Sequence, residues 1–145
     1  MTDGGIYFSE GGEEMKKFNI QDGYGIVKLQ RAGVPVGLIT GRVSRMVQRR
    51  AEELGIAHVY QNLEDKIVAY RDVKSKLGLS DAEIAYVGDD EPDLQLLQIV
   101  GFSAAPSDAV EAVKRSVDYV CKRKGGEGAV REVIDLLLGG RGGRR

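Results

Sequence analysis

A regular alternation of short apolar segments with helical patterns limits the possible folds of this chain most strongly. Apolar runs of strand length lie at residues 36–40, 58–61, 84–88, 101–105 and 117–121. Between them, apolar residues repeat at helical spacing, and several of these segments end at a glycine. Continuous apolar runs are typical of strands that are buried on both faces. We therefore predict an α/β fold with a parallel, Rossmann-like sheet between two layers of helices.

The domain organisation follows from the length of the chain. A chain of 145 residues is large enough for one domain with its own core. We predict a single domain over residues 1–138, in which residues 4–20 form a β-hairpin around a Gly-Gly turn. Residues 139–145 contain only glycine and arginine, so we expect this basic tail to be disordered.

Charge and cysteine content argue against several classes of partner. The net charge of −1 provides no field that would attract nucleic acid or an acidic membrane. The single cysteine, Cys121, cannot form an internal disulfide and is expected to be a small core residue. No apolar run is long enough to span a bilayer, and the N-terminus has no signal-peptide pattern. We expect a cytoplasmic protein.

Polar residues stand where two of the predicted strands end. Thr40 closes the first apolar run, and Asp89 and Asp90 follow the run at 84–88. Ligands of open α/β sheets bind beyond the carboxyl ends of the strands, so these residues are candidates for a site. A carboxylate beyond a wholly apolar strand also needs a partner, which makes Asp89 the hardest of them to dismiss.

Three segments together resemble the haloacid dehalogenase superfamily. Residues 38–42 (Leu-Ile-Thr-Gly-Arg), Lys66 and residues 87–93 (Val-Gly-Asp-Asp-Glu-Pro-Asp) resemble its second, third and fourth motifs, in the expected order. The hairpin and residues 125–132 (Gly-Gly-Glu-Gly-Ala-Val-Arg-Glu) are similar to the branch that dephosphorylates 3-deoxy-D-manno-octulosonate (KDO) 8-phosphate. That branch has no large cap domain, and the resemblance covers the chain to about Leu138.

The resemblance implies a Mg²⁺-dependent phosphatase that acts on a sugar-acid phosphate through an aspartyl-phosphate intermediate. It assigns catalytic roles to Thr40 and Lys66. It makes Asp89 a ligand of the metal. Asp90 and Asp93 would complete the surroundings of the metal or orient Lys66. The implied substrate-binding residues are Thr40, Gly41, Arg42, Lys66 and Arg131. Arg42 favours the eight-carbon acid, because we expect an acidic residue there in the branch for the nine-carbon acid. The family also implies a homotetramer built with the hairpin.

Each of these residues also has an ordinary structural interpretation. Thr40 could only finish a β-branched strand, and Lys66 could be a solvated helix residue. Asp90 and Asp93 could be acidic residues of a first helical turn, which the helix dipole favours. Arg42 could pair with an acidic residue on the surface. The single histidine, His58, is expected at a strand end rather than on a metal.

One family motif does not occur in the chain. The family's nucleophile and general acid lie in an Asp-x-Asp-Gly motif after a central strand, and residues 1–145 contain no Asp-x-Asp. Asp3 has no second carboxylate two residues later, so we do not assign it this role. We expect the chain to be inactive by itself, and the strands that end at Thr40 and Asp89 either to close on each other or to leave a gap.

Three alternatives to the leading function stay open. The chain could be a non-catalytic module that keeps the phosphate and metal pocket. It could instead act on the related nine-carbon sugar acid phosphate. A response-receiver-like domain also carries carboxylates at strand ends, but the hairpin and the placement of Thr40, Gly41 and Arg42 argue against it.

Overall fold

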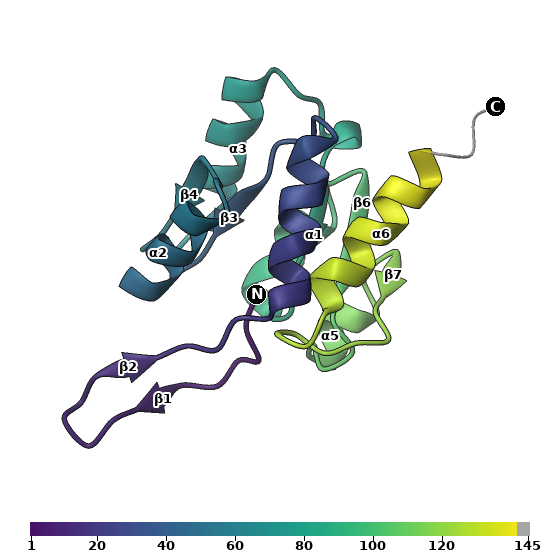
Figure 1. Cartoon of the computed structure of the whole chain (residues 1–145). Coiled ribbons are helices and arrows are strands. Elements are labelled where there is room, and N and C mark those ends of the chain that lie inside the picture. Colours follow the sequence, from purple (N-terminus) through teal and green to yellow (C-terminus); the bar gives the residue numbers. More distant parts are fainter. Residues whose placement is uncertain (142–145) are drawn as a thin grey trace.

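The computed structural model describes residues 1–141, and its elements follow the predicted alternation (Figure 1). The helices are α1 (Ile20–Arg31), α2 (Arg45–Glu53), α3 (Lys66–Leu77), α4 (Leu94–Leu97), α5 (Glu111–Lys114) and α6 (Ala129–Arg141). The strands are β1 (Tyr7–Phe8), β2 (Glu14–Met15), β3 (Gly37–Ile39), β4 (His58–Tyr60), β5 (Ala85–Val87), β6 (Phe102–Ala105) and β7 (Tyr119–Val120). Two short 3₁₀ turns, η1 (Asp81–Glu83) and η2 (Glu91–Asp93), flank β5.

The strands form three separate sheets. The hairpin strands β1 and β2 pair antiparallel, β3 pairs with β4 in parallel, and β5, β6 and β7 form a parallel sheet in that order. In residues 1–141, no strand joins β3 to β5, and these two strands do not pair with each other. We predicted that β3 and β5 either close on each other or leave a gap between them. They have not closed on each other. The α/β class is confirmed, but as two parallel sheets.

The predicted burial of the strands that end at Thr40 and Asp89 is wrong. Residues of β3 and β5 are exposed or half-buried, whereas Ser103, Ala104 and Ala105 of β6 are buried. A strand is buried on both faces and both edges only when it has neighbours on each side. β6 has a strand on either side, while β3 and β5 each have one free edge among the described strands.

Helices hold the two parallel sheets together. On one face, Ile67 and Tyr70 of α3 pack in one cluster with Leu96 of α4. Ile39, the last residue of β3, and Tyr86 of β5 join this cluster. Elsewhere α1 lies between α2 and α6 (Figure 1). Two buried glycines of α1 allow this close packing. A Cβ at Gly23 would meet the Arg50 side chain of α2 at 2.3 Å, and one at Gly25 would meet Arg131 of α6 at 2.9 Å.

The core of the larger sheet is built around β6. Ala104 packs with Cys121, Ala129 and Val133 towards α6, whereas the next residue, Ala105, packs with Leu97 and Val113 towards α4 and α5. Successive residues of a strand point to opposite faces, so this sheet has helices on both sides. Cys121 is 2% exposed, which confirms the predicted core position.

The hairpin and the C-terminal helix complete the fold. The hairpin projects from the rest of the molecule (Figure 1), and its turn contains the predicted Gly11 and Gly12. The prediction of a disordered tail is wrong for residues 139–141, because α6 continues to Arg141. Glycine lowers helix propensity by about 1 kcal/mol but does not forbid helical geometry. Residues 142–145 lie outside the described residues. No described helix is long and apolar enough to cross a membrane.

Candidate active site

Asp93 is the centre of the candidate site. Its side chain is 3% exposed, and four donors surround its carboxylate. Oδ1 accepts hydrogen bonds from the Lys66 ammonium at 2.6 Å and the Tyr86 hydroxyl at 2.7 Å. Oδ2 accepts from the backbone N–H groups of Asp89 at 3.1 Å and Asp90 at 3.3 Å. A buried carboxylate with this many donors is fixed in place.

The position of Asp93 depends on Gly88 at the end of β5. A Cβ at residue 88 would lie 2.5 Å from the Asp93 Cβ, so only glycine lets the aspartate fold back under the strand end. Burial alone would raise the pKa of Asp93. The hydrogen bonds from Lys66 and Tyr86 and the lysine charge outweigh burial, so the pKa lies below its ordinary value. The carboxylate is therefore charged at neutral pH.

Lys66 is the first residue of α3 and follows the carboxyl end of β4. Its side chain is 17% exposed, so it lies largely inside the protein. The ion pair with Asp93 connects the β3–β4 sheet to the segment that follows β5. Lys66 is therefore not the freely solvated helix residue of the alternative interpretation.

Thr40 lies at the same edge as Lys66. Because β3 and β4 are parallel, the residues after both strands are at one end of this sheet. Thr40 donates its backbone N–H to the Tyr60 carbonyl, and its Oγ1 accepts the Arg42 N–H at 3.2 Å. Ile39, directly before it, packs in the same cluster as Ile67, directly after Lys66. No hydrogen bond joins the Thr40 and Lys66 side chains among the described residues.

Asp89 is the exposed partner of Asp93. Partial burial by the surrounding protein and the nearby charge of Asp93 raise the pKa of Asp89, and the Lys66 charge opposes this shift. Asp90 is exposed and caps the turn that follows, accepting the Glu91 N–H at 2.8 Å. The two neighbouring carboxylates, Asp89 and Asp93, therefore have opposite pKa shifts: partial burial and the Asp93 charge disfavour the ionised form of Asp89, whereas hydrogen-bond donors stabilise the ionised form of Asp93.

The described residues contain no group of three or more Asp, Glu, His or Cys side chains that could hold a metal ion. Asp93 is occupied by Lys66, Tyr86 and backbone N–H groups, which leaves Asp89 and Asp90 facing outwards. Mg²⁺ is often bound by only one or two carboxylates together with water. Asp89 fits such an ion as a single ligand, but residues 1–141 do not form a full ligand set.

The predicted substrate-binding residues lie in different places. Gly41 packs against the backbone of the next loop, since a Cβ there would meet the Leu63 carbonyl at 3.2 Å. The Arg42 side chain is 57% exposed and lies 3.7 Å from Glu14 of β2. Arg131 points towards α1: its guanidinium pairs with Asp135 of α6 and lies 5.4 Å from the centre of the Tyr24 ring of α1.

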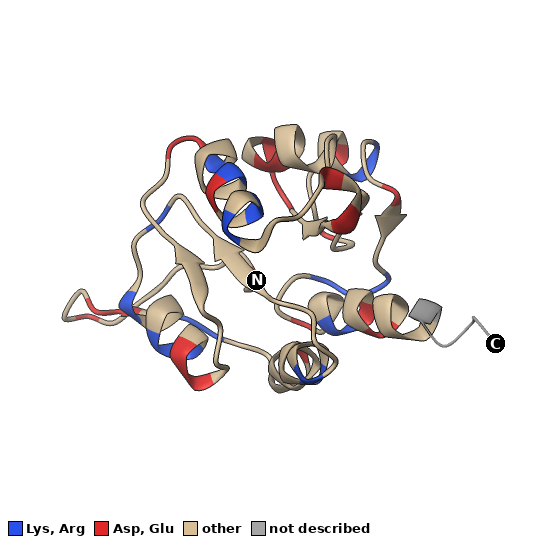
Figure 2. Ribbon diagram, turned by 90° about the horizontal axis from the view of Figure 1, so that it is seen from above, with Lys and Arg blue, Asp and Glu red and all other residues tan. Residues whose placement is uncertain are grey.

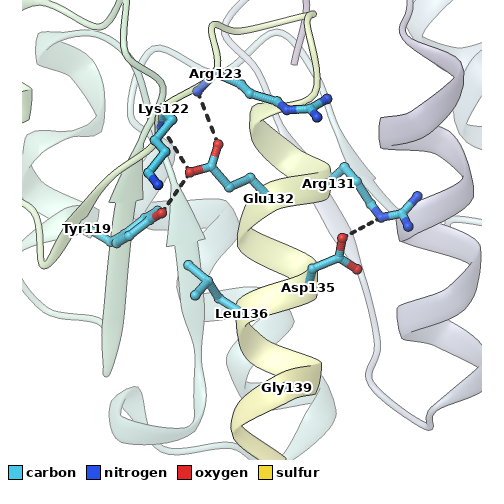
Figure 3. A pocket seen from close by; sticks show the side chains of 8 residues that line it. All are labelled: Tyr119, Lys122, Arg123, Arg131, Glu132, Asp135, Leu136 and Gly139. Atoms are coloured by element: carbon cyan, nitrogen blue, oxygen red, sulfur yellow. Dashed lines mark hydrogen bonds and ion pairs between the residues drawn. The ribbon is translucent and has the colours of Figure 1, made fainter.

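Arg131 also lines a surface pocket of about 710 Å³ between β7 and α6 (Figure 3). In this pocket, Glu132 accepts the Tyr119 hydroxyl and the backbone N–H groups of Lys122 and Arg123 (Figure 3). These bonds fix the loop after β7. None of Thr40, Lys66 and Asp89 lines the pocket. Within the described part of one chain, Arg131 is thus not brought together with Lys66.

Asp3 has a local role in the hairpin. Its carboxylate accepts the Tyr7 hydroxyl at 2.6 Å and the Gly5 N–H at 2.9 Å. These bonds are consistent with the prediction that Asp3 is not the nucleophile. Basic and acidic residues occur together on the same helices, and no helix in the described chain presents one sign of charge alone (Figure 2).

Sequence patterns did not identify Tyr86 as part of this site. It lies within the apolar run at 84–88, where an aromatic residue is expected simply to pack. The only available signal was its hydroxyl, since a buried tyrosine usually needs a hydrogen-bond partner.

The sequence and fold of this chain match known proteins. The pattern of the haloacid dehalogenase-like hydrolases matches residues 55–134, more than half of the chain. The KDO 8-phosphate phosphatase of Escherichia coli K12 is 44% identical over 138 residues, which cover 95% of this chain and 73% of that enzyme. The crystal structure of the Yersinia pestis enzyme is 45% identical with a TM-score of 0.93, over 95% of this chain and 75% of that one. The Moraxella catarrhalis enzyme, solved with a magnesium ion, a phosphate ion and a KDO molecule, is 42% identical with a TM-score of 0.92, over 95% and 79%.

Fold, strand-end residues and these matches define a class of enzyme: the chain belongs to the haloacid dehalogenase-like hydrolases. Within that class it falls in the family of KDO 8-phosphate phosphatases, as its motifs predict.

Proposed function

We propose that this protein is a phosphatase that hydrolyses KDO 8-phosphate to KDO and phosphate. One observation supports the proposal most directly. The Lys66 ammonium, which follows the β3–β4 sheet as Thr40 does, is bonded to Asp93, which also accepts the backbone N–H of Asp89 after β5. Phosphoryl transfer depends mainly on positioning and on stabilising charge on the phosphoryl oxygens. A fixed ammonium beside a hydroxyl and a metal-binding carboxylate provides these functions.

Each residue has a proposed task. Lys66 binds phosphoryl oxygens, and the Thr40 hydroxyl donates to one of them. Asp89, with Asp90 beside it, contributes to a Mg²⁺ ion, which when bound neutralises charge on the phosphate. The exposed guanidinium of Arg42 binds the substrate carboxylate in the bidentate manner that arginine favours. Arg131 contacts substrate bound to a neighbouring copy, since within its own chain it contacts Asp135 and Tyr24 rather than the residues around Lys66.

Turnover needs a nucleophile that residues 1–145 do not supply. We expect the purified 1–145 polypeptide to release no phosphate from KDO 8-phosphate in the presence of Mg²⁺. A version with an apolar strand ending in Asp-x-Asp-Gly joined before Met1 should be active, and changing the first Asp of that motif to Asn should abolish activity. Mg²⁺-dependent turnover by 1–145 alone would contradict the assigned mechanism.

The substrate is tested separately on the extended, active version. KDO 8-phosphate should be hydrolysed faster than the nine-carbon acid phosphate. Arg42→Ala should raise the KM for KDO 8-phosphate about tenfold or more, as expected for the loss of a charged hydrogen-bonded contact. A smaller model phosphomonoester without a carboxylate is the control, because its KM should not change. Equal losses for both compounds would contradict the role of Arg42.

A non-catalytic phosphate-binding module is the second candidate. It requires only the fixed Lys66 ammonium to hold a phosphate, and no nucleophile. It predicts that the extended version binds phosphate without turnover, which the same assay detects.

We also propose a cytoplasmic homo-oligomer, a tetramer as in the family, acting in lipopolysaccharide biosynthesis. Ile6, Phe8 and Met15 of the hairpin are 48%, 64% and 56% exposed, and such an isolated hairpin is not stable alone. Native mass spectrometry should detect a tetramer, and Phe8→Glu should shift it towards monomer. Lys28→Glu on α1, away from the hairpin, is the control.

A further inference from the structure

The hydroxyl of Tyr86 has a single hydrogen-bond partner among the described residues, and that partner is Asp93. The ring of Tyr86 packs against two apolar clusters, one with Leu97 and Val113 and the other with Ile67 and Leu96. Only the hydroxyl leaves these clusters. Leaving a hydroxyl without a partner at such a position is costly, so the bond to Asp93 is well determined.

The four donors around Asp93 come from two parts of the chain. Tyr86 and the backbone N–H groups of Asp89 and Asp90 belong to β5 and the turn after it. The fourth donor, Lys66, comes from α3. Three donors therefore fix the Asp93 carboxylate relative to β5. The carboxylate in turn fixes the Lys66 ammonium, which belongs to α3.

Of the three donors on β5 and the turn after it, only Tyr86 donates from its side chain. The backbone donors bind Oδ2, so Oδ1 is shared by Tyr86 at 2.7 Å and Lys66 at 2.6 Å. Without the hydroxyl, Oδ1 would be held by the lysine alone. The carboxylate and the ammonium could then move together, and the ammonium would no longer be fixed relative to the strand end.

We propose that Tyr86 is a positioning residue of this site: its hydroxyl locks Asp93 so that the Lys66 ammonium is fixed at the sheet edge, where phosphate binds. That phosphate binds at this site rests on the proposed function. The placement of Lys66 by Tyr86 and Asp93 does not depend on it. Tyr86 does not touch substrate in this role.

The test uses the full 1–145 chain with ¹³C-labelled lysine, and inorganic phosphate as the probe. The Lys66 ε-carbon resonance, assigned by its loss in Lys66→Met, reports the placement of the ammonium without any ligand. In Tyr86→Phe this resonance should move towards the position of exposed lysines, and phosphate affinity should fall about tenfold. Tyr70→Phe is the matched control, because Tyr70 also shares an aspartate oxygen with a lysine, but at Asp81. Tyr70→Phe should leave the Lys66 resonance at its wild-type position and the phosphate affinity within about twofold of the wild type, as expected for a bond outside the site.

The two possible failures are distinguishable. If the wild type does not respond to phosphate, the proposed phosphate site is wrong, while the ligand-free Lys66 signal still tests Tyr86. An unchanged Lys66 signal in folded Tyr86→Phe would overturn the inference.

A second measurement does not require the phenylalanine variant to fold. In Lys66→Met, the ¹³Cζ resonance of Tyr86 should keep its wild-type value, since the donors on residues 86–90 hold Asp93 without the lysine. Movement of that resonance would show that the lysine holds the tyrosine and would also overturn the inference.

Discussion

Two regions of this protein use the same three residue types with different results. At the sheet edge, the site triad (Tyr86, Asp93 and Lys66) places a hydroxyl and an ammonium on one carboxylate oxygen, and the surface triad (Tyr70, Asp81 and Lys74) repeats this arrangement. The carboxylate is 3% exposed in the site triad and 44% exposed in the surface triad. Asp93 also accepts two backbone N–H groups, whereas no backbone donor to the Asp81 carboxylate is found among the described residues.

This difference shows that burial and backbone donors, not the residue types, decide what such a triad does. The surface triad can exchange its bonds for water at little cost, because exposed ion pairs contribute little. The site triad cannot do so, because an unpaired charge in a buried position is costly. A site that must hold an ammonium against a phosphate needs the second kind. The comparison can be tested by changing the same residue type in both triads.

The largest expected effect is that of Asp93→Asn. It removes the charge that compensates Lys66 and weakens acceptance of the backbone N–H groups. We expect the free energy of unfolding to fall by about 3 kcal/mol, as for other broken buried pairs. Urea denaturation followed by circular dichroism measures it. Asp81→Asn is the matched control and should cause a clearly smaller loss. Equal losses would break the comparison.

A smaller effect is expected for Lys66→Met. Asp93 keeps three of its four donors in this variant, so the loss in unfolding free energy should be only about 1–2 kcal/mol. Phosphate binding, measured by NMR titration, should be lost because the ammonium is gone. Lys74→Met should lower stability less and leave phosphate binding unchanged. If both variants bound phosphate equally well, the site triad would have no special role.

Much of the site could be predicted from sequence because chain order fixes it. Thr40 and Asp89 follow apolar runs, and in each of the two parallel sheets the residues after the strands lie at the carboxyl end, where sites form. The order of the motifs also indicated Lys66, and the alternative that Asp93 orients this lysine is the one that the structure has. These features depend on local sequence and on the direction of the strands.

The rest depends on neighbours that sequence patterns do not specify. An apolar run cannot reveal that β3 and β5 each have a free edge among the strands that the structure describes, since burial depends on which strand lies alongside. It also cannot tell that the hydroxyl of Tyr86 leaves the core towards Asp93, because the same pattern fits a tyrosine that only packs. The direction of Arg131 is decided by Asp135 and Tyr24, which are residues outside the family motifs.

The pH dependence of stability should separate the effect of Asp93 further. Its pKa is lowered in the folded state, so its contribution is complete above the ordinary aspartate pKa and is lost as the pH falls through the lowered value. The stability difference between wild type and Asp93→Asn should therefore be constant from pH 7 to about pH 4 and shrink below it. Urea denaturation at several pH values gives this difference. A gap that widened in acid would contradict the sign.

The smallest effect, and one of opposite sign, is expected for Asp89→Asn. The pKa of Asp89 is raised by partial burial and by Asp93, so its ionised form is disfavoured in the folded protein. This cost is absent below the ordinary aspartate pKa and grows as the pH rises through the raised value. Asp89→Asn should thus match the wild type near pH 3.5 and be slightly more stable at pH 7, by less than about 1 kcal/mol because the side chain faces solvent.

The same variant should bind Mg²⁺ more weakly, measured by calorimetry on the extended version. A carboxylate that weakens the fold but binds the metal would mark Asp89 as the functional member of the pair and Asp93 as the structural one. A loss of stability at pH 7 would instead mean that both carboxylates support the fold.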